Sequence, residues 1–406
     1  MIRNLLPILI LLSGWSAAWA EPTGFTLIGG ARSVRIPVEI QNNIILIPLR
    51  INGSFEMNFI LDTGVKTTIL VEPVISPFLA LDSVRKVLVR GLGDGNAIEA
   101  AMARNVSIAL PGVEGRGINL LVLPEGIISY SGMFGKPVYG IIGYEIFNQF
   151  IVELNYQQKY IQLYNPFEFK LLGRWSRLPI GLNRSKPYVT AEMTDFRGEH
   201  IKSEWLIDTG ASMAISLFDE RLPVPEKAIE AFLGQGLSGN VYGKMARVKT
   251  FQLGDFIFED VITGYPEPGS LNLPESDSAV WYGNIGAEVI SRFRIIFDYG
   301  NEQIFLRKNS EFKSKFEYNV SGIEVVASGL AYDVYLVTYV RPGSPAEYAG
   351  LKVNDELISV NGSPVIGLTI EDIYTQLSKR IGRNALVKVR RNGAVFKFSF
   401  PLTEDL

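Results

Sequence analysis

Two Asp-Thr-Gly triplets carry the clearest chemical signal in the sequence. The first, Asp62-Thr63-Gly64, follows the apolar run Phe59-Ile60-Leu61, and the second, Asp208-Thr209-Gly210, follows Trp205-Leu206-Ile207. A carboxylate at the end of a buried strand is costly to desolvate, so each one needs a partner or hydrogen bonds. Two carboxyls within hydrogen-bond reach share one proton, which lets one act as a base and the other as an acid.

An internal repeat gives the two triplets matching positions. Residues 139–163 read YGIIGYEIFNQFIVELNYQQKYIQL and residues 282–306 read YGNIGAEVISRFRIIFDYGNEQIFL, so nine of 25 positions are identical at an offset of 143. The triplets themselves are 146 residues apart, which a three-residue insertion or deletion explains. We therefore predict two homologous lobes, at residues 21–168 and 169–312, followed by an unrepeated segment at 313–406.

The composition excludes several other chemistries. The 406 residues include no cysteine and one histidine, His200, which we expect on the surface. Thiolate nucleophiles, disulfides and cysteine metal sites are excluded, and a Ser-His-Asp triad is disfavoured. With 39 Lys+Arg against 42 Asp+Glu there is no polybasic field, so we expect no nucleic-acid partner. Carboxylates remain as the acid–base groups, and we expect no metal or other cofactor.

The N-terminus has the pattern of a signal peptide. Arg3 precedes the apolar run Leu5–Leu12, and Ala18-Trp19-Ala20 fits a cleavage site. The run is too short to span a bilayer, although an uncleaved anchor is the alternative. We expect a signal peptide at 1–20, no stable membrane span after cleavage, and export to a bacterial periplasm or the extracellular space, where a chain without cysteine is more usual than in eukaryotic secretion.

Each lobe is expected to be mostly β. Short runs rich in β-branched residues, such as 44–51 and 57–61, are separated by Asn and Gly turns, and 295–306 reads as two strands around a tight turn. Glycines cluster near the middle of each lobe, at Gly91, Gly93 and Gly95 and again at Gly234 and Gly236. No Gly-Lys-Ser/Thr follows either cluster, so neither fits a phosphate loop.

The repeated triplets resemble the pepsin–retropepsin family of aspartic proteases over about residues 30–310. Residues 208–212, DTGAS, are similar to the retropepsin signature, and Ile142-Gly143 and Ile285-Gly286 stand where the family has an apolar-Gly pair. The resemblance implies a bilobal acid-protease fold. It also implies residue roles: Asp62 and Asp208 as the catalytic dyad, Thr63 and Thr209 as crossed hydrogen-bond partners, Gly64, Gly210 and Ser212 as support, and the two glycine clusters as substrate flaps.

One position departs from that pattern. The first lobe has Val65-Lys66 where the second has Ala211-Ser212. An ammonium beside the dyad would lower a carboxyl pKa and keep both aspartates charged. The alternative is that Lys66 points to solvent.

The C-terminal segment resembles a PDZ domain over about residues 320–402. Residues 341–351, RPGSPAEYAGL, and 354–362, NDELISVNG, carry the resemblance, with Asn354 in place of the usual Gly. Thr369–Asp372 forms a capping box that opens the groove helix, with Ile373 and Leu377 on one face. The resemblance implies that peptide C-termini add as a strand to an open sheet edge. By similarity to bacterial C-terminal processing proteases, Ser321, Gly322 and Ile323 would form the carboxylate loop.

Together these patterns predict an all-β chain: two tandem retropepsin-like lobes and a C-terminal PDZ domain of β-sandwich/α type, joined by a polar linker at 308–315. The predicted activity is that of a monomeric aspartic endopeptidase that acts on polypeptides and takes peptide C-termini at its PDZ domain. Two alternatives remain: a peptide-binding protein without catalysis, and an envelope scaffold that acts through the PDZ domain alone.

Overall fold

The computed structural model describes residues 23–82, 84–89, 97–219, 222–269, 282–378 and 381–406. The predicted signal peptide and the glycines Gly91, Gly93 and Gly95 lie outside these residues. The described chain is mostly β, and the prediction of two β lobes with a C-terminal PDZ domain is confirmed. Within the described ranges, no helix is long and apolar enough to cross a membrane.

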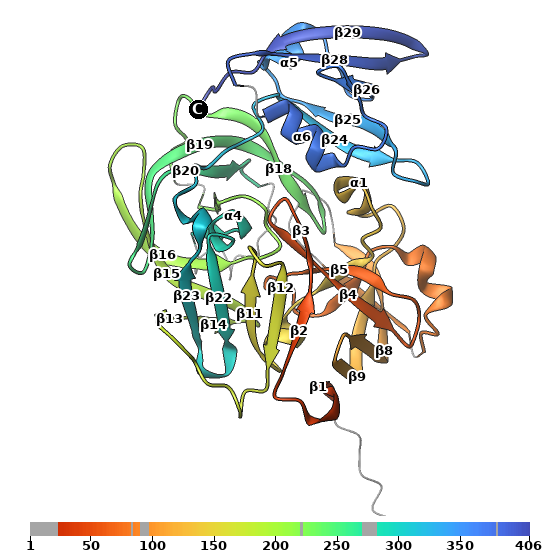
Figure 1. Cartoon of the computed structure of the whole chain (residues 1–406), viewed down its shortest axis with the longest axis vertical. Coiled ribbons are helices and arrows are strands. Elements are labelled where there is room, and N and C mark those ends of the chain that lie inside the picture. The colour runs from red at the N-terminus through yellow and green to blue at the C-terminus, as the bar shows by residue number, and fades with distance from the viewer. Residues whose placement is uncertain (1–22, 83, 90–96, 220–221, 270–281, 379–380) are drawn as a thin grey trace, which may run out of the picture.

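Four sheets organise the described chain (Figure 1). The lobe-1 sheet contains β1 (Gly24–Leu27), β3 (Glu39–Gln41), β4 (Ile44–Ile51), β5 (Met57–Leu61), β6 (Thr68–Leu70), β7 (Arg85–Val89), β8 (Ile98–Leu110), β9 (Val113–Val122) and β10 (Gly140–Ile142). The lobe-2 sheet contains β14 (Gly181–Asn183), β15 (Lys186–Thr194), β16 (His200–Ile207), β17 (Ile215–Leu217), β18 (Ile229–Gly236), β19 (Gly239–Leu253), β20 (Phe256–Pro266) and β21 (Gly283–Ile285).

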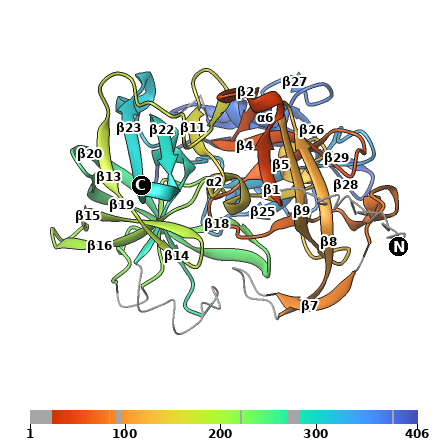
Figure 2. The same cartoon turned by 90° about the horizontal axis from the view of Figure 1, so that it is seen from below.

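A third sheet is built from both lobes and lies between them (Figures 1 and 2). Its strands are β2 (Ser33–Pro37), β11 (Ile151–Asn155), β12 (Tyr160–Tyr164), β13 (Ser176–Pro179), β22 (Phe293–Asp298) and β23 (Gln303–Lys308). The lobes meet where β11 pairs antiparallel with β22, with Val152 opposite Phe297 and Asn155 opposite Arg294. Because the repeat supplies both strands, the two halves of the molecule face each other across this pair.

The fourth sheet belongs to the PDZ domain. Its strands are β24 (Ile323–Ser328), β25 (Val334–Val340), β26 (Glu356–Val360), β27 (Ser363–Pro364), β28 (Asn384–Arg391) and β29 (Ala394–Pro401). Helices α5 (Pro345–Ala349) and α6 (Ile370–Ser378) accompany it. The predicted capping box is formed: Asp372 N donates to Thr369 Oγ1 and Thr369 N donates to Asp372 Oδ2. Ile373 and Leu377 of α6 are fully buried in the separate PDZ core.

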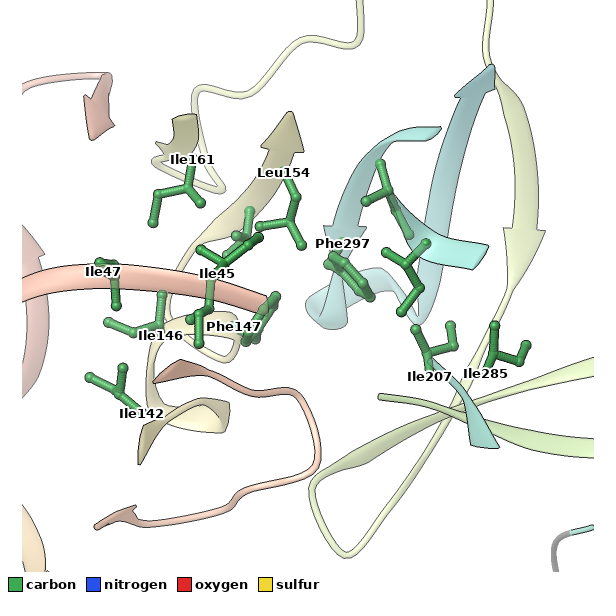
Figure 3. Close-up of a cluster of buried hydrophobic side chains, with 14 of the residues drawn as sticks. Ile45, Ile47, Ile142, Ile146, Phe147, Leu154, Ile161, Ile207, Ile285 and Phe297 are labelled. Atoms are coloured by element: carbon green, nitrogen blue, oxygen red, sulfur yellow. The ribbon is translucent and has the colours of Figure 1, made fainter. Parts of the chain in front are cut away.

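Short helices complete the lobes. They are α1 (Ser131–Phe134), α2 (Tyr144–Phe147) and α4 (Ala287–Ile290), with short 3₁₀ segments at η1 (Ile28–Gly30), η2 (Pro73–Phe78), η3 (Tyr299–Asn301) and η4 (Ser310–Lys313). Aliphatic and aromatic side chains from both lobes form one continuous core, part of which Figure 3 shows. At its centre Phe147 of α2 meets Phe297 of β22 edge to face, with ring centroids 5.2 Å apart.

The polar segment at 308–315 is not a free linker. The buried guanidinium of Arg292 donates hydrogen bonds to the backbone carbonyls of Glu311, Ser314 and Lys315. The ring of Phe316 is buried and lies 3.7 Å from the Arg292 guanidinium carbon. The linker interpretation is wrong here because Arg292 binds main-chain carbonyls, which a polar side-chain composition does not reveal.

Candidate active site

Parallel strand pairs place both aspartates at equivalent positions. β5 pairs with β10 so that Leu61 lies opposite Ile142, and β16 pairs with β21 so that Ile207 lies opposite Ile285. The next amide on each chain continues the ladder: Asp62 N donates to Ile142 O and Asp208 N to Ile285 O, both at 2.9 Å. Each aspartate therefore lies at the end of a buried pair of strands, which holds its backbone in place.

Glycines make room where the chains approach most closely. A Cβ at Gly143 would lie 1.8 Å from Asp62 O, and one at Gly286 would lie 2.0 Å from Met213 O. A Cβ at Gly210 would lie 2.5 Å from Asp62 Oδ2, so the carboxyl of one lobe packs against the triplet backbone of the other. The glycine of each apolar-Gly pair is therefore required by backbone contact, with the first triplet at Gly143 and with the residues just after the second triplet at Gly286.

The two threonines connect the lobes by crossed hydrogen bonds. Thr63 N donates to Thr209 Oγ1 at 3.0 Å, and Thr209 N donates to Thr63 Oγ1 at 3.1 Å. Each hydroxyl then donates to a carbonyl of the opposite strand, Thr63 to Ile207 O at 2.6 Å and Thr209 to Leu61 O at 2.9 Å. Both threonines are fully buried, so this clasp fixes the two triplets against each other.

Each carboxyl accepts a hydrogen bond from its own triplet. Gly64 N donates to Asp62 Oδ1 at 2.6 Å, and Gly210 N donates to Asp208 Oδ1 at 3.0 Å. Asp208 accepts one more hydrogen bond, from Asn284 Nδ2 to its Oδ2 at 3.0 Å. The sequence analysis missed Asn284, although the repeat aligns it with Ile141 and so marks a difference between the lobes.

The two carboxyls interact directly. Burial and the negative charge of Asp208 raise the pKa of Asp62 to about 7, and a hydrogen bond between the carboxyls acts in the same direction. The amide of Gly64 and the charge of Lys186 oppose that rise. Asp62 is therefore protonated in acid and near-neutral solution, beside an Asp208 whose oxygens accept hydrogen bonds from Gly210 N and Asn284 Nδ2.

Three further polar groups interact electrostatically with the dyad, and the sequence did not predict them. Lys186 begins β15 and is half-buried, and its charge reaches Asp62. Burial and the charges of both aspartates raise the pKa of the Tyr130 phenol, and burial and the charge of Asp62 raise that of Tyr299. The hydroxyl of Tyr299 has no hydrogen-bond partner among the described residues.

Two predicted residues lie away from the carboxyls. Lys66 is exposed and is not among the groups that shift the pKa of Asp62, so the lysine that matters electrostatically is Lys186. Ser212 is also exposed and, within the described chain, makes no hydrogen bond to either aspartate; it lines the adjacent cavity instead. His200 is exposed at the start of β16.

A cavity of about 1060 Å³ lies beside the second triplet. Ser212 and Met213 form part of its wall, and the hairpin of β18 and β19, which contains Gly234 and Gly236, forms another. A third wall comes from the PDZ domain, including Gly322, Val325 and Tyr339, and lobe 1 contributes Ser129 and Met133. The cavity is large enough for several side chains of an extended peptide.

The predicted carboxylate loop lies at the entry to β24 and faces this cavity through Gly322. Ser321, Gly322 and Ile323 are buried, and Gly322 has a φ of +77°, which favours glycine. Ile323 N lies 3.4 Å from Ser321 Oγ, to which it donates. The loop is held from behind by Arg341 N, which donates to Gly322 O at 2.7 Å.

These features define two classes of module, and comparison with known proteins agrees. The aspartyl protease family matches residues 47–146, which contain the first triplet and Gly143, and the PDZ domain family matches residues 336–391. The chain thus contains an aspartyl protease domain and a C-terminal PDZ domain.

One curated relative is similar over a short stretch. The carboxy-terminal processing protease CtpB of Bacillus subtilis (strain 168) is 39% identical over 57 residues. These residues are 14% of this chain and span only 12% of the relative's length.

Proposed function

We propose that this protein is an aspartic endopeptidase in which Asp62 and Asp208 activate one water molecule. The observation that carries the proposal is the reciprocal threonine clasp, which brings two Asp-Thr-Gly carboxyls together so that they share a proton. A buried clasp of this kind can hold two reacting groups within the small tolerance that acid–base catalysis needs.

The chemistry follows from the shared proton. The charged carboxyl takes a proton from the water as its oxygen attacks the peptide carbonyl carbon. The protonated carboxyl gives its proton to the carbonyl oxygen, which forms a gem-diol. Collapse of that intermediate breaks the C–N bond: the charged carboxyl takes a proton from one diol hydroxyl, which re-forms a carbonyl, while the protonated carboxyl gives its proton to the leaving nitrogen. Each step exchanges one proton between the pair and the substrate.

The alternative of a peptide-binding protein without catalysis loses its sequence support. That alternative depended on an ammonium at Lys66 close to the dyad, and the Lys66 side chain is exposed. The charge of Lys186 opposes the rise in the pKa of Asp62 but does not outweigh burial and Asp208, because that pKa remains about 7.

We propose that the PDZ domain binds polypeptide C-termini as an added strand at β24, the edge strand of its sheet. The glycine-containing hairpin β18–β19 would act as a flap over a substrate in the cavity beside the second triplet, which is called the cleft below. The signal-peptide pattern at 1–20 supports a further proposal of export from a bacterial cytoplasm, which mass spectrometry of the mature N-terminus tests.

Hydrolysis of casein between pH 3 and 9, with and without pepstatin, tests the proposed activity. Asp62→Asn and Asp208→Asn should each lower turnover by at least roughly 100-fold, since the remaining carboxyl cannot be both acid and base. The exposed Asp255→Asn serves as the matched control. Because the shared proton does the work of a Lewis acid, EDTA should leave the rate unchanged. Near-wild-type turnover in either dyad variant would refute the proposal.

A further inference from the structure

The two halves of the dyad differ at one position. In lobe 2, Asn284 of β21 lies opposite Leu206 of β16 and donates to Asp208. In lobe 1, the repeat places Ile141 of β10 at the same position, opposite Ile60 of β5. Among the described residues, Asp208 therefore accepts two hydrogen bonds from N–H groups, whereas Asp62 accepts one, from Gly64.

Stability alone does not explain an asparagine here. Asn284 is only 4% exposed, and its Oδ1 has no partner among the described residues. A buried carbonyl without a partner costs free energy, and the matching strand in lobe 1 takes an isoleucine. What the asparagine adds is the hydrogen bond to Asp208.

We propose that Asn284 is a positioning residue that holds Asp208 as the charged member of the pair and leaves the shared proton on Asp62. An amide N–H can only donate, so it stabilises the carboxylate form of the oxygen that it contacts. Asp208 then takes the proton from water, and Asp62 protonates the substrate carbonyl. This assignment rests on the proposed function.

The other groups around the pair do not supply this asymmetry. Lys186 at the start of β15 lowers the pKa of Asp62 and so favours charge on Asp62 rather than on Asp208. Tyr130 before α1 and Tyr299 of η3 are phenols whose pKa values burial raises, so they stay neutral. Asn284 is thus the side-chain donor that specifically favours charge on Asp208 within the described residues.

Kinetics of Asn284→Ile, which installs the lobe-1 residue, provide the first test. Loss of the donor removes the hydrogen bond that favours the charged form of Asp208, so the acidic limb of the pH–rate profile should move up by roughly one pH unit. We expect kcat at the optimum to fall roughly tenfold while KM stays within about twofold. Ile141→Leu, at the equivalent position of lobe 1, is the matched control and should leave the limb in place.

Carbon-13 NMR titration provides a readout that does not need activity. In Asp62→Asn the Asp208 carboxyl titrates without its partner, and adding Asn284→Ile should raise its pKa by roughly one unit. An unchanged Asp208 pKa would overturn the assignment. If no variant and no wild-type protein hydrolyses peptides, the proposed function fails, yet the titration still decides the role of Asn284.

A second inference starts from the outer edge of β24, the end strand of the PDZ sheet. Val325 N donates to the Tyr374 hydroxyl of α6 at 2.9 Å, and that hydroxyl lies 3.3 Å from Val325 O. Since β24 is an edge strand, these are the backbone groups that an added peptide strand would pair with. The same hydroxyl also donates to Glu324 Oε2 at 2.7 Å.

The other end of the edge is covered by lobe 1. Helix α1 packs on β24 (Figure 1): a Cβ at Gly132 would lie 3.0 Å from Ala327 O, and one at Gly135 would lie 3.7 Å from Ala327 Cβ. The residue that precedes α1 is Tyr130, a buried phenol whose pKa the charges of both aspartates raise. The PDZ edge and the dyad are therefore joined by one short segment.

The PDZ domain also contacts the β18–β19 hairpin. The Tyr339 ring of β25 lies 5.8 Å from the Tyr242 ring of β19 and 6.5 Å from the Phe232 ring of β18, measured between centroids. Phe232 and Tyr242 are themselves 5.7 Å apart. Three aromatic rings thus fix the hairpin to the strand next to β24.

We infer that the β24 edge is a latch with two alternative occupants. When it is empty, Tyr374 and α1 close it, and the PDZ domain holds α1 and the hairpin over the cleft. When an extended peptide pairs with Val325 and Ala327, it displaces both, and the cleft opens. The inference deepens the proposed function by assigning regulation to the same site.

An engineered disulfide between α1 and β24 tests the latch by holding it closed. The chain contains no cysteine of its own that could form a competing disulfide. A Cβ built at Gly132 lies 3.5 Å from Val326 Cβ, within the range that a disulfide spans. Gly132→Cys/Val326→Cys should cross-link on oxidation and lose at least roughly fivefold in casein turnover, with recovery in dithiothreitol. The two single variants are the controls and should show no redox dependence.

Amide hydrogen exchange separates this inference from the proposed function. Oxidation should slow exchange in α1 and also in the β18–β19 hairpin, with no substrate present. An oxidised protein that is as active as the reduced one would overturn the latch, as would a hairpin whose exchange does not respond. An inactive wild type refutes the protease proposal, whereas the exchange result still tests the latch.

Discussion

At the scale of single residues, two lysines near the first triplet differ in their effect on Asp62. Lys66 is exposed, whereas the charge of Lys186 lowers the pKa of Asp62 against burial and Asp208. Removing that charge in Lys186→Met should raise the pKa of Asp62 above about 7. The singly protonated pair then persists to higher pH, so the alkaline limb of the pH–rate profile should move up by roughly 0.3–1 unit.

Lys66→Met is the matched control for this shift. It removes the same charge from an exposed position and should leave both limbs unchanged. A limb that moves with Lys66→Met and not with Lys186→Met would show that the sequence-based concern about Lys66 was right and the electrostatic assignment wrong.

The buried dyad should also make stability depend on pH. The pKa of Asp62 is about 7 in the folded protein and 3.8 as its ordinary value. The unfolded chain therefore loses this proton first as pH rises, and the free energy of unfolding falls between about pH 4 and 7. Asp62→Asn removes the cost, so its stability relative to wild type should improve by roughly 2–4 kcal/mol between pH 4 and 8.

Urea unfolding of wild type and Asp62→Asn at about pH 4 and about pH 8 measures this difference in stability. Burial also raises the pKa of Glu145 and Glu288 to about 7 each, so the wild-type curve contains their contributions as well. Those contributions cancel in the comparison with Asp62→Asn. A variant that tracks wild type at both pH values would contradict the raised pKa of Asp62.

At the scale of elements, the threonine clasp is the contact that fixes the two strand ends. Thr63→Val keeps the side-chain shape but leaves Thr209 N and Ile207 O without their partner. Two buried backbone groups without partners should cost roughly 2–5 kcal/mol, visible as a lower urea midpoint. Thr63→Ser keeps the hydroxyl and should lose far less, and equal losses in the two variants would mean that packing rather than hydrogen bonding holds the lobes.

The elements that the sequence predicts are those whose signal is local and repeated. Each triplet follows its own apolar strand, and the repeat pairs Gly143 with Gly286, so the strand ends and their crossed threonines could be anticipated. Asn284 and Lys186 carry no such local signal, because they reach the carboxyls from strands 76 and 124 positions away. Their roles depend on the three-dimensional approach of β21 and β15.

At the scale of the whole molecule, the PDZ domain rests on both lobes rather than hanging from a linker. Its β24 contacts α1, its Tyr339 contacts the β18–β19 hairpin, and the preceding chain is held by Arg292. A truncation must therefore spare the carbonyls of Ser314 and Lys315. A chain that ends after Lys313 loses them and leaves a buried guanidinium short of acceptors, so it should unfold at lower urea than one that ends after Asn319.

Truncation after Asn319 then shows what the PDZ domain contributes to catalysis. We expect this protein to cleave a short fluorogenic peptide at least as fast as the full chain, because the contacts that hold α1 and the hairpin over the cleft are gone. It should cleave a protein with a free apolar C-terminus less well, mainly through a higher KM, since the tethered second binding site is lost. The full chain assayed on the same two substrates is the reference. A similar fall on both substrates, in a truncated protein that unfolds at the expected urea concentration, would show instead that the PDZ domain holds the cleft in its working shape.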